Sequence, residues 1–224
     1  MKLRTNLDET VWVAGDAQSW VASGETGVSR CMLDRDGDEI AVATSLVRYA
    51  PGSSFAPHSH DLGEEFIVLQ GVFSDEAGDY PAGTYVRNPP GSRHRPHSDG
   101  GCLIFVKLRQ FHPLDSTPVV ADLAAWPQTG PAPAAAVVRS VYAYGEERVS
   151  AVRVPAGTRF AFAAAYHVRE LLVLAGELTW QQEQTYRLGP HSWIRMAPGE
   201  PLRINAVTDC VIFSKTRPVY PGSN

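Results

Sequence analysis

One stretch decides how this 224-residue sequence folds: GSSFAPHSHDLGEEFIVLQG, residues 52–71. Side chains two residues apart in a strand point to the same face, so His58 and His60 are expected to project together into a barrel lumen. Glu64 follows across a predicted turn, beside the start of the apolar strand Glu65–Leu69. The stretch therefore predicts two imidazoles and one carboxylate on the inner side of a small β-barrel.

A second segment completes this group of side chains. It runs from Gly83 through Pro89 and Gly91 to His94, and its glycines and prolines shape turns that can bring His94 back to the first three side chains. Three imidazoles and one carboxylate suit a divalent transition metal. We therefore predict a metal site with four ligands: His58, His60, Glu64 and His94.

Other polar side chains near these motifs are interpreted differently. Glu65 is an alternative carboxylate ligand, but the alternation along the strand favours its neighbour Glu64. His97 is expected at the rim of the site or in contact with a ligand, with a role as a metal ligand as the alternative, and His112 is expected to be structural. The pair Asp75-Glu76 is interpreted as a solvated acidic turn, with contact to a metal ligand as the alternative.

The remaining sequence consists of short apolar or alternating strands between Gly- and Pro-containing turns, such as Pro51-Gly52 and Pro198-Gly199. Many short strands with regular turn signals predict an all-β sandwich or barrel. One exception is a short helix expected near Val120–Ala125. The Pro-rich residues Pro127–Pro133 after it are interpreted as a linker.

The two halves of the chain resemble each other. Val68-Leu69-Gln70-Gly71 matches Val173-Leu174-Ala175-Gly176 at an offset of 105 residues, and Cys102-Leu103-Ile104-Phe105 matches Cys210-Val211-Ile212-Phe213 at an offset of 108. A fixed offset of this kind indicates two copies of one β domain. The expected domains are a metal-binding domain at 1–112, a linker at 113–137 and a degenerate domain at 138–224.

The second copy lacks the four candidate ligands. The same offsets place a neutral or cationic side chain at every ligand position: Ala163, Ala165, Arg169 and Leu202. These side chains cannot hold a divalent ion, so we expect one metal ion per chain, in the first half. Arg169 is expected to pair with Glu170 or Glu177; the alternative is a positive charge in a second pocket, suited to a carboxylate.

Composition excludes several classes of protein. The formal charge is −4 and no cluster of Lys and Arg occurs, which argues against direct binding of nucleic acid. No apolar run reaches the length of a membrane span, and the first residues lack the apolar core of a signal peptide. The three cysteines are widely spaced, which favours reduced thiols and a cytoplasmic location. Cys102 and Cys210 are expected in the core, with redox sensing by Cys102 as the alternative.

The two motif segments resemble the paired motifs of the cupin superfamily. This resemblance implies two tandem cupin barrels, that is, double-stranded β-helix or jelly-roll domains, with a metal on His58, His60, Glu64 and His94. Residues 57–76 and 83–107 further resemble the cupin domain of ChrR-type anti-sigma factors, a zinc-binding sensory module for oxidative stress. The resemblance implies zinc as the favoured ion, while Fe, Mn and Ni suit the same ligands.

Two functions follow from this resemblance. The first is a regulatory metal-binding bicupin with a role in stress-responsive transcription. ChrR-type proteins grip a sigma factor through a separate helical domain with an HxxxCxxC motif, which this sequence lacks, so a sigma factor is only a candidate partner. The alternative is a metal-dependent dioxygenase of the cupin type, for example one that cleaves diketones. A small-molecule ligand and a homodimer are further expectations.

Overall fold

The computed structural model describes residues 1–38, 40–125, 134–182 and 184–219, and it contains strands but no helix within these ranges. The predicted all-β class is confirmed. The chain forms two compact units: residues 1–5 and 19–124 belong to the first, and residues 6–18 and 134–219 belong to the second. The predicted linker Pro127–Pro133 lies outside the described residues. No helix long and apolar enough to cross a membrane occurs in the described ranges.

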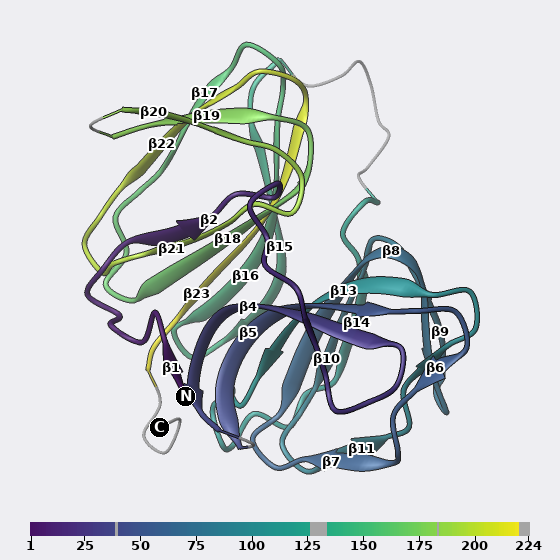
Figure 1. The fold of residues 1–224 in the computed structure, drawn as a ribbon. Coiled ribbons are helices and arrows are strands. Elements are labelled where there is room, and N and C mark those ends of the chain that lie inside the picture. Colours follow the sequence, from purple (N-terminus) through teal and green to yellow (C-terminus); the bar gives the residue numbers. More distant parts are fainter. Residues whose placement is uncertain (39, 126–133, 183, 220–224) are drawn as a thin grey trace. The chain divides into compact units, whose positions relative to one another are not determined.

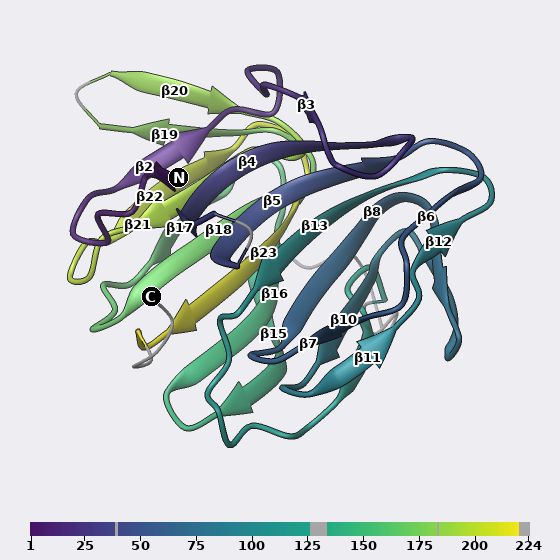
Figure 2. The ribbon, with the colours of Figure 1, turned by 60° about the horizontal axis from the view of Figure 1, so that its bottom comes forward.

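The first unit is a jelly-roll built around one long sheet. Its strands are β1 (Lys2–Leu3), β3 (Val21–Ala22), β4 (Val28–Gly37), β5 (Ala41–Tyr49), β6 (Ser53–Ser54), β7 (His58–His60), β8 (Glu64–Asp75), β9 (Gly78–Pro81), β10 (Thr84–Asn88), β11 (Ser92–His94), β12 (His97–Ser98), β13 (Cys102–Leu108) and β14 (Val119–Asp122). The sheet has the order β1-β4-β5-β13-β8-β10-β14, and β7 pairs with β11 in a separate two-stranded sheet. Figure 2 shows β4, β5, β13 and β8 side by side.

Alternation along these strands fills the lumen of the first unit. Val47 and Tyr49 of β5, Phe66 and Val68 of β8, and Ile104 of β13 belong to one buried apolar cluster. Val47 and Tyr49 are two residues apart in β5, and Phe66 and Val68 are two residues apart in β8, so the members of each pair point to the same face of the sheet. The same alternation at the start of β8 directs the Glu64 side chain toward this lumen.

The second unit repeats the architecture in two sheets. Its strands are β2 (Val11–Val13), β15 (Val137–Tyr144), β16 (Glu147–Val154), β17 (Arg159–Phe162), β18 (Val168–Ala175), β19 (Leu178–Gln181), β20 (Thr185–Leu188), β21 (Trp193–Met196), β22 (Leu202–Ala206) and β23 (Cys210–Arg217). The orders are β15-β16-β23-β18-β21-β2 and β17-β22-β19-β20. A buried cluster that includes Leu171, Trp180, Leu202 and Ile212 fills its core.

Strand β2 joins the second unit although it lies near the start of the sequence. It pairs with β21 through Val11↔Arg195 and Val13↔Trp193, and Figure 1 shows it, in purple, beside β21. The Trp12 ring packs against Trp180 and Tyr186, with ring centroids 5.3 and 4.6 Å away. The sequence-based boundaries at 112 and 138 stay predictions, and the compact units add this early strand to the later residues.

The prediction of a short helix near Val120–Ala125 is wrong. Residues Val119–Asp122 form β14, which pairs with β10 through Thr84↔Asp122 and Arg87↔Val119. The β-branched pair Val119-Val120 favours a strand, and the edge of the sheet at β10 supplies backbone hydrogen-bond partners that an isolated short helix would lack.

Candidate metal centre

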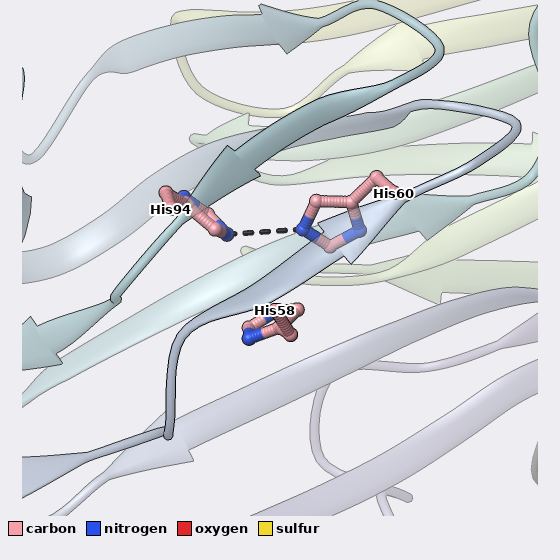
Figure 3. Close-up of side chains that lie close together, drawn as sticks. All are labelled: His58, His60 and His94. Atoms are coloured by element: carbon pink, nitrogen blue, oxygen red, sulfur yellow. Dashed lines mark hydrogen bonds between the residues drawn. The ribbon is translucent and has the colours of Figure 1, made fainter.

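Three imidazoles meet because two short strands pair. Strand β7 carries His58 and His60, and β11 carries His94, with the register His58↔His94 and His60↔Ser92. Directly opposite residues lie about 5 Å apart at Cβ, so this register brings the side chains within reach of one another. The three ring centroids are 4.8 to 5.1 Å apart, and Figure 3 shows the rings converging.

Glu64 closes the group from the adjoining strand. Its Oε2 lies 3.5 Å from Nε2 of His60 and 3.5 Å from Nε2 of His94. A turn brings it there: the Gly63 amide donates to the His60 carbonyl at 3.2 Å, and Gly63 has φ +77°. A Cβ on Gly63 would lie 2.6 Å from the Phe111 ring, so the turn requires glycine for both its conformation and its space.

The spacing of these donor atoms fits a single metal ion. Ligand atoms of His58, His60 and His94 all lie within 4.8 Å of one another, and the Nε2 atoms of His60 and His94 are 3.0 Å apart. Metal–nitrogen bonds of about 2.0–2.1 Å place neighbouring donors about 3.0 Å apart in an octahedron and about 3.4 Å apart in a tetrahedron. The observed 3.0 and 3.5 Å distances among His60, His94 and Glu64 are close to these edges, and the ligand atom of His58 lies within 4.8 Å of those of the other two histidines.

Hydrogen bonds fix which ring nitrogens face the group. Asp75 Oδ2 lies 3.1 Å from Nδ1 of His94, and the Ala56 carbonyl lies 2.9 Å from Nδ1 of His58. Both oxygens can only accept when Asp75 is ionised, so each Nδ1 carries the proton and each Nε2 keeps its lone pair. A carboxylate or carbonyl partner of this kind commonly orients the histidine ligands of metals.

The protonation of the group also suits a cation. Burial, followed by the neighbouring His58, lowers the pKa of His60 to about 4, so its ring is neutral near pH 7. Burial raises the pKa of Glu64, while His94 and the amide of Asn88, which donates to Oε2 at 3.1 Å, oppose that rise. A divalent ion would favour the ionised carboxylate further.

The other acidic and histidine candidates lie elsewhere, with one exception. Glu65 points away from the group and accepts from Tyr85 Oη at 2.7 Å and Arg87 Nη1 at 3.1 Å. His97 on β12 lies opposite Ser54, and His112 Nδ1 accepts from the Leu114 amide. The exception is Asp75, which contacts the candidate ligand His94. The sequence favours a solvated acid here, and the structure agrees with the alternative, contact with a ligand.

The described residues of the second unit present no equivalent group. Arg169, at the position of Glu64, donates from Nη1 to the Ala163 carbonyl at 2.5 Å and stacks 5.5 Å from the Phe162 ring. The expected pairing of Arg169 with Glu170 or Glu177 is wrong, because those carboxylates bond to Trp193 and Arg187 instead. Across the described parts of the chain, His58, His60 and His94 form the only cluster of three metal-ligating residues found.

The three cysteines are buried and unpaired. Burial raises the pKa of Cys31 and Cys102, and burial with the nearby Asp209 raises that of Cys210 to about 11. Such thiols stay protonated near pH 7 and behave as small apolar side chains. The expectation of core thiols is confirmed for Cys102 and Cys210, and the geometry gives no support to redox sensing by Cys102.

A cavity of about 410 Å³ opens onto the histidine group from within the first unit. Its walls include His58, His60 and Glu64 together with largely apolar side chains: Val47, Tyr49, Phe55, Phe73, Ile104, Val106 and Leu108. The volume is in the range of small-molecule sites. The sequence motifs identified the polar end of this cavity but not its apolar walls.

Comparisons with known proteins agree with this geometry. Residues 8–112 match the family model described as the ChrR cupin-like domain. No curated protein matches the chain in sequence. Among solved structures, protein Ylba of Escherichia coli is similar with 13% identity and a TM-score of 0.72, over 95% of this chain and 92% of that one.

Two further structures share the fold. Bacterial pirin YhhW of Escherichia coli, solved in complex with nickel(II), has 12% identity and a TM-score of 0.71, over 95% of this chain and all of that one. Salicylate 1,2-dioxygenase of Pseudaminobacter salicylatoxidans has 14% identity and a TM-score of 0.57, over 78% and 70% of the two chains. At these identities the likeness concerns the fold alone. The family match over residues 8–112 and the jelly-roll units together support a cupin-superfamily protein whose first unit resembles the cupin-like domain of ChrR.

Proposed function

We propose that the first unit binds one divalent transition metal ion through His58, His60, Glu64 and His94, and that the ion acts on a small organic molecule held in the adjoining cavity. The observation that carries this proposal is the position of three of the four donor groups, His58, His60 and Glu64, at the wall of a 410 Å³ cavity, with His94 paired opposite His58. A purely structural metal site needs no such cavity, because its coordination is closed by protein ligands.

The reaction class proposed is a dioxygenase of the cupin type. A bound metal with open coordination positions supplies activation of oxygen or of a chelating substrate. Four protein ligands leave two positions free on an ion that takes six, whereas they fill a tetrahedral zinc site. Iron or manganese therefore suits the catalytic role better than zinc, the ion that the sequence resemblance favours.

This chain's own residues would perform three tasks in such a reaction. Asp75 and the Ala56 carbonyl keep His94 and His58 in the orientation that presents Nε2. Asn88 holds the Glu64 carboxylate. The apolar side chains of Phe55, Ile104 and their neighbours exclude water from the bound molecule.

A second candidate function is a zinc-dependent sensor of oxidants that acts in transcription regulation. The match of residues 8–112 to the ChrR cupin-like domain favours it. In this role the same four residues would hold zinc, and a change at the site would alter contact with a protein partner, with a sigma factor as the first candidate.

Metal loading separates the two functions. The chain is purified without added metal, analysed for its elements, and then loaded separately with Fe(II) or Zn(II). The enzyme proposal expects about one ion per chain, and oxygen uptake with Fe(II) and small diketones or related acids. Two ions per chain would contradict the assignment of the site to the first unit.

The same samples test the sensor. Release of zinc by peroxide or singlet oxygen, without oxygen uptake in the iron form, would overturn the dioxygenase and support the sensor. Oxygen uptake by the iron form, with zinc retained under oxidant, would overturn the sensor. A variant with His58→Ala and His60→Ala controls for metal bound elsewhere and should contain none.

A further inference from the structure

Two arginines of strand β4 face the cavity because the strand contains a bulge. Arg30 lies opposite Val47 of β5, and Arg35 lies opposite Ala43. Directly paired residues share a face of the sheet, and both partners line the cavity. Residues 30 and 35 would point to opposite faces of a regular strand. The register shift between Met32 and Asp34 reverses the alternation and brings both guanidinium groups to the inner face.

These arginines place two positive charges at the cavity wall. Among its other charged residues, Arg109 is paired with Asp61, Glu64 is engaged by the histidines and Asn88, and Glu25 is a solvent-exposed carboxylate. Arg35 donates from Nε to the Gly37 carbonyl at 3.2 Å, which fixes its side chain. Within the described residues, the Arg30 side chain makes no hydrogen bond or ion pair. Burial, followed by the charge of Arg30, lowers the pKa of Arg35. Two neighbouring guanidinium groups of which one is unpaired favour an anionic ligand.

Tyr49, at the end of β5, lines the same cavity as the two arginines and the metal ligands His58, His60 and Glu64. The residue is 94% buried, and its ring packs against Phe55 and Phe73 at centroid distances of 5.6 and 5.7 Å. Burial and the Glu64 carboxylate raise the pKa of the phenol, while Arg30 opposes them, so the hydroxyl lies within the fields of both groups. No described residue hydrogen-bonds this hydroxyl, which leaves a donor directed at the cavity.

The apolar walls limit the rest of the ligand. Phe55, Ile104, Val106 and Leu108 provide an aromatic and aliphatic surface on the way from β4 to the histidines. A cavity of about 410 Å³ accommodates a molecule the size of a single substituted ring.

We propose that this cavity binds a small carboxylate with an apolar, ring-sized body, its carboxylate on Arg30 with Arg35 beside it and Tyr49 as a further donor. The proposal rests on the proposed function, because it names the substrate class of the same site. The body would lie against Phe55 and Ile104, with its far end toward the metal ligands.

The test compares benzoate with benzamide, its uncharged isostere, by isothermal titration calorimetry. Both compounds are titrated into the metal-free and the zinc-loaded chain, as wild type, Arg30→Met and Arg30→Lys. Loss of a charged hydrogen-bond partner should weaken benzoate by about tenfold or more in both forms for Arg30→Met. Benzamide should change by less than about twofold, because it carries no charge to pair. Arg30→Lys should retain part of the benzoate affinity, since it keeps the charge but not the planar fork.

Arg48→Gln is the matched control. Arg48 is the exposed neighbour of Tyr49 on the other face of β5, where it stacks 4.1 Å from the Trp20 ring, and its loss should leave benzoate binding unchanged. Wild type that binds no benzoate, or an Arg30→Met variant that affects both compounds equally or neither, would overturn the proposal.

Elemental analysis of the same samples keeps this proposal separate from the proposed function. Benzoate binding that depends on Arg30 in a chain that holds no metal would support the carboxylate site and contradict the metal centre. A chain that holds one tightly bound ion, and whose benzoate binding does not change in the Arg30 variants, would support the metal centre and contradict the carboxylate site.

Discussion

Asp75 and His94 are joined by a hydrogen bond of 3.1 Å that runs from the ring Nδ1 to the carboxylate Oδ2. The carboxylate also accepts from Tyr80 Oη at 3.2 Å and from the Ala77 amide at 2.9 Å through Oδ1. Asp75 is thus itself held in place, and through it the ring of His94 is held with Nε2 toward His60.

Replacing Asp75 with asparagine should weaken metal binding without unfolding the chain. The amide keeps the size of the side chain but removes the negative charge that fixes the imidazole and raises its basicity. Loss of such a partner lowers metal affinity by about 10- to 100-fold. Competition with a chromogenic chelator measures the change. Glu76→Gln is the control, because Glu76 accepts from the Arg95 amide and does not contact a histidine of the group. Equal affinities in the two variants would refute this role of Asp75.

Replacing His94 with alanine should abolish tight metal binding while the fold persists. A structural metal carries the folding energy of very small domains, but each unit here has its own apolar core. Elemental analysis after mild chelation and circular dichroism give the two readouts. His97→Ala, three residues along the chain and outside the group, should retain the metal. A His94→Ala chain that is unfolded, or that still holds its ion, would contradict the expectation.

The three thiols should react slowly in the folded chain. Burial raises the pKa of Cys31, Cys102 and Cys210, so the thiolate that attacks a disulfide reagent is scarce near pH 7. Labelling with an aromatic disulfide should be slow in buffer and fast for all three thiols in denaturant. Fast reaction of Cys102 in the folded chain would revive the redox interpretation that the geometry does not support.

Gly63→Ala should damage both the fold and the site. A positive φ at a residue with a Cβ, together with a contact of 2.6 Å to the Phe111 ring, is expected to cost about 1–3 kcal/mol of unfolding free energy. Relief of that contact would displace Glu64, so metal affinity should fall as well. Chemical denaturation and chelator competition measure the two effects. Gly24→Ala has open space around it and no positive φ, and should change neither.

Local patterns predicted the part of the site that lies within short strands. His58 and His60 share a face because strand geometry has a period of two, and the turn at Gly63 brings Glu64 back toward them. The all-β class and the duplication follow from turn spacing and repeated segments in the same way.

Other features depend on pairings that local patterns do not specify. Asp75 reaches His94 because β8 is twelve residues long and its far end pairs with β12 through Ser74↔His97. The bulge in β4 contains no glycine or proline that would reveal it in the sequence. Regular alternation along β4 therefore does not predict that the Arg35 side chain points inward. The prediction of a short helix near Val120 is wrong because those residues join the edge of β10, which lies 32 to 38 residues away in sequence.

The pairing of β2 with β21 has a consequence for how the chain is made. Val11 is synthesised 184 residues before its partner Arg195. The second unit therefore cannot complete its sheet until Arg195 has been made, and closing so long a loop slows folding. Until then the edge of β2 and the Trp12 side chain have no native partner. Synthesis thus passes through a period in which β2 is open to pairing with other chains, and a chaperone that covers Val11–Val13 would suppress aggregation.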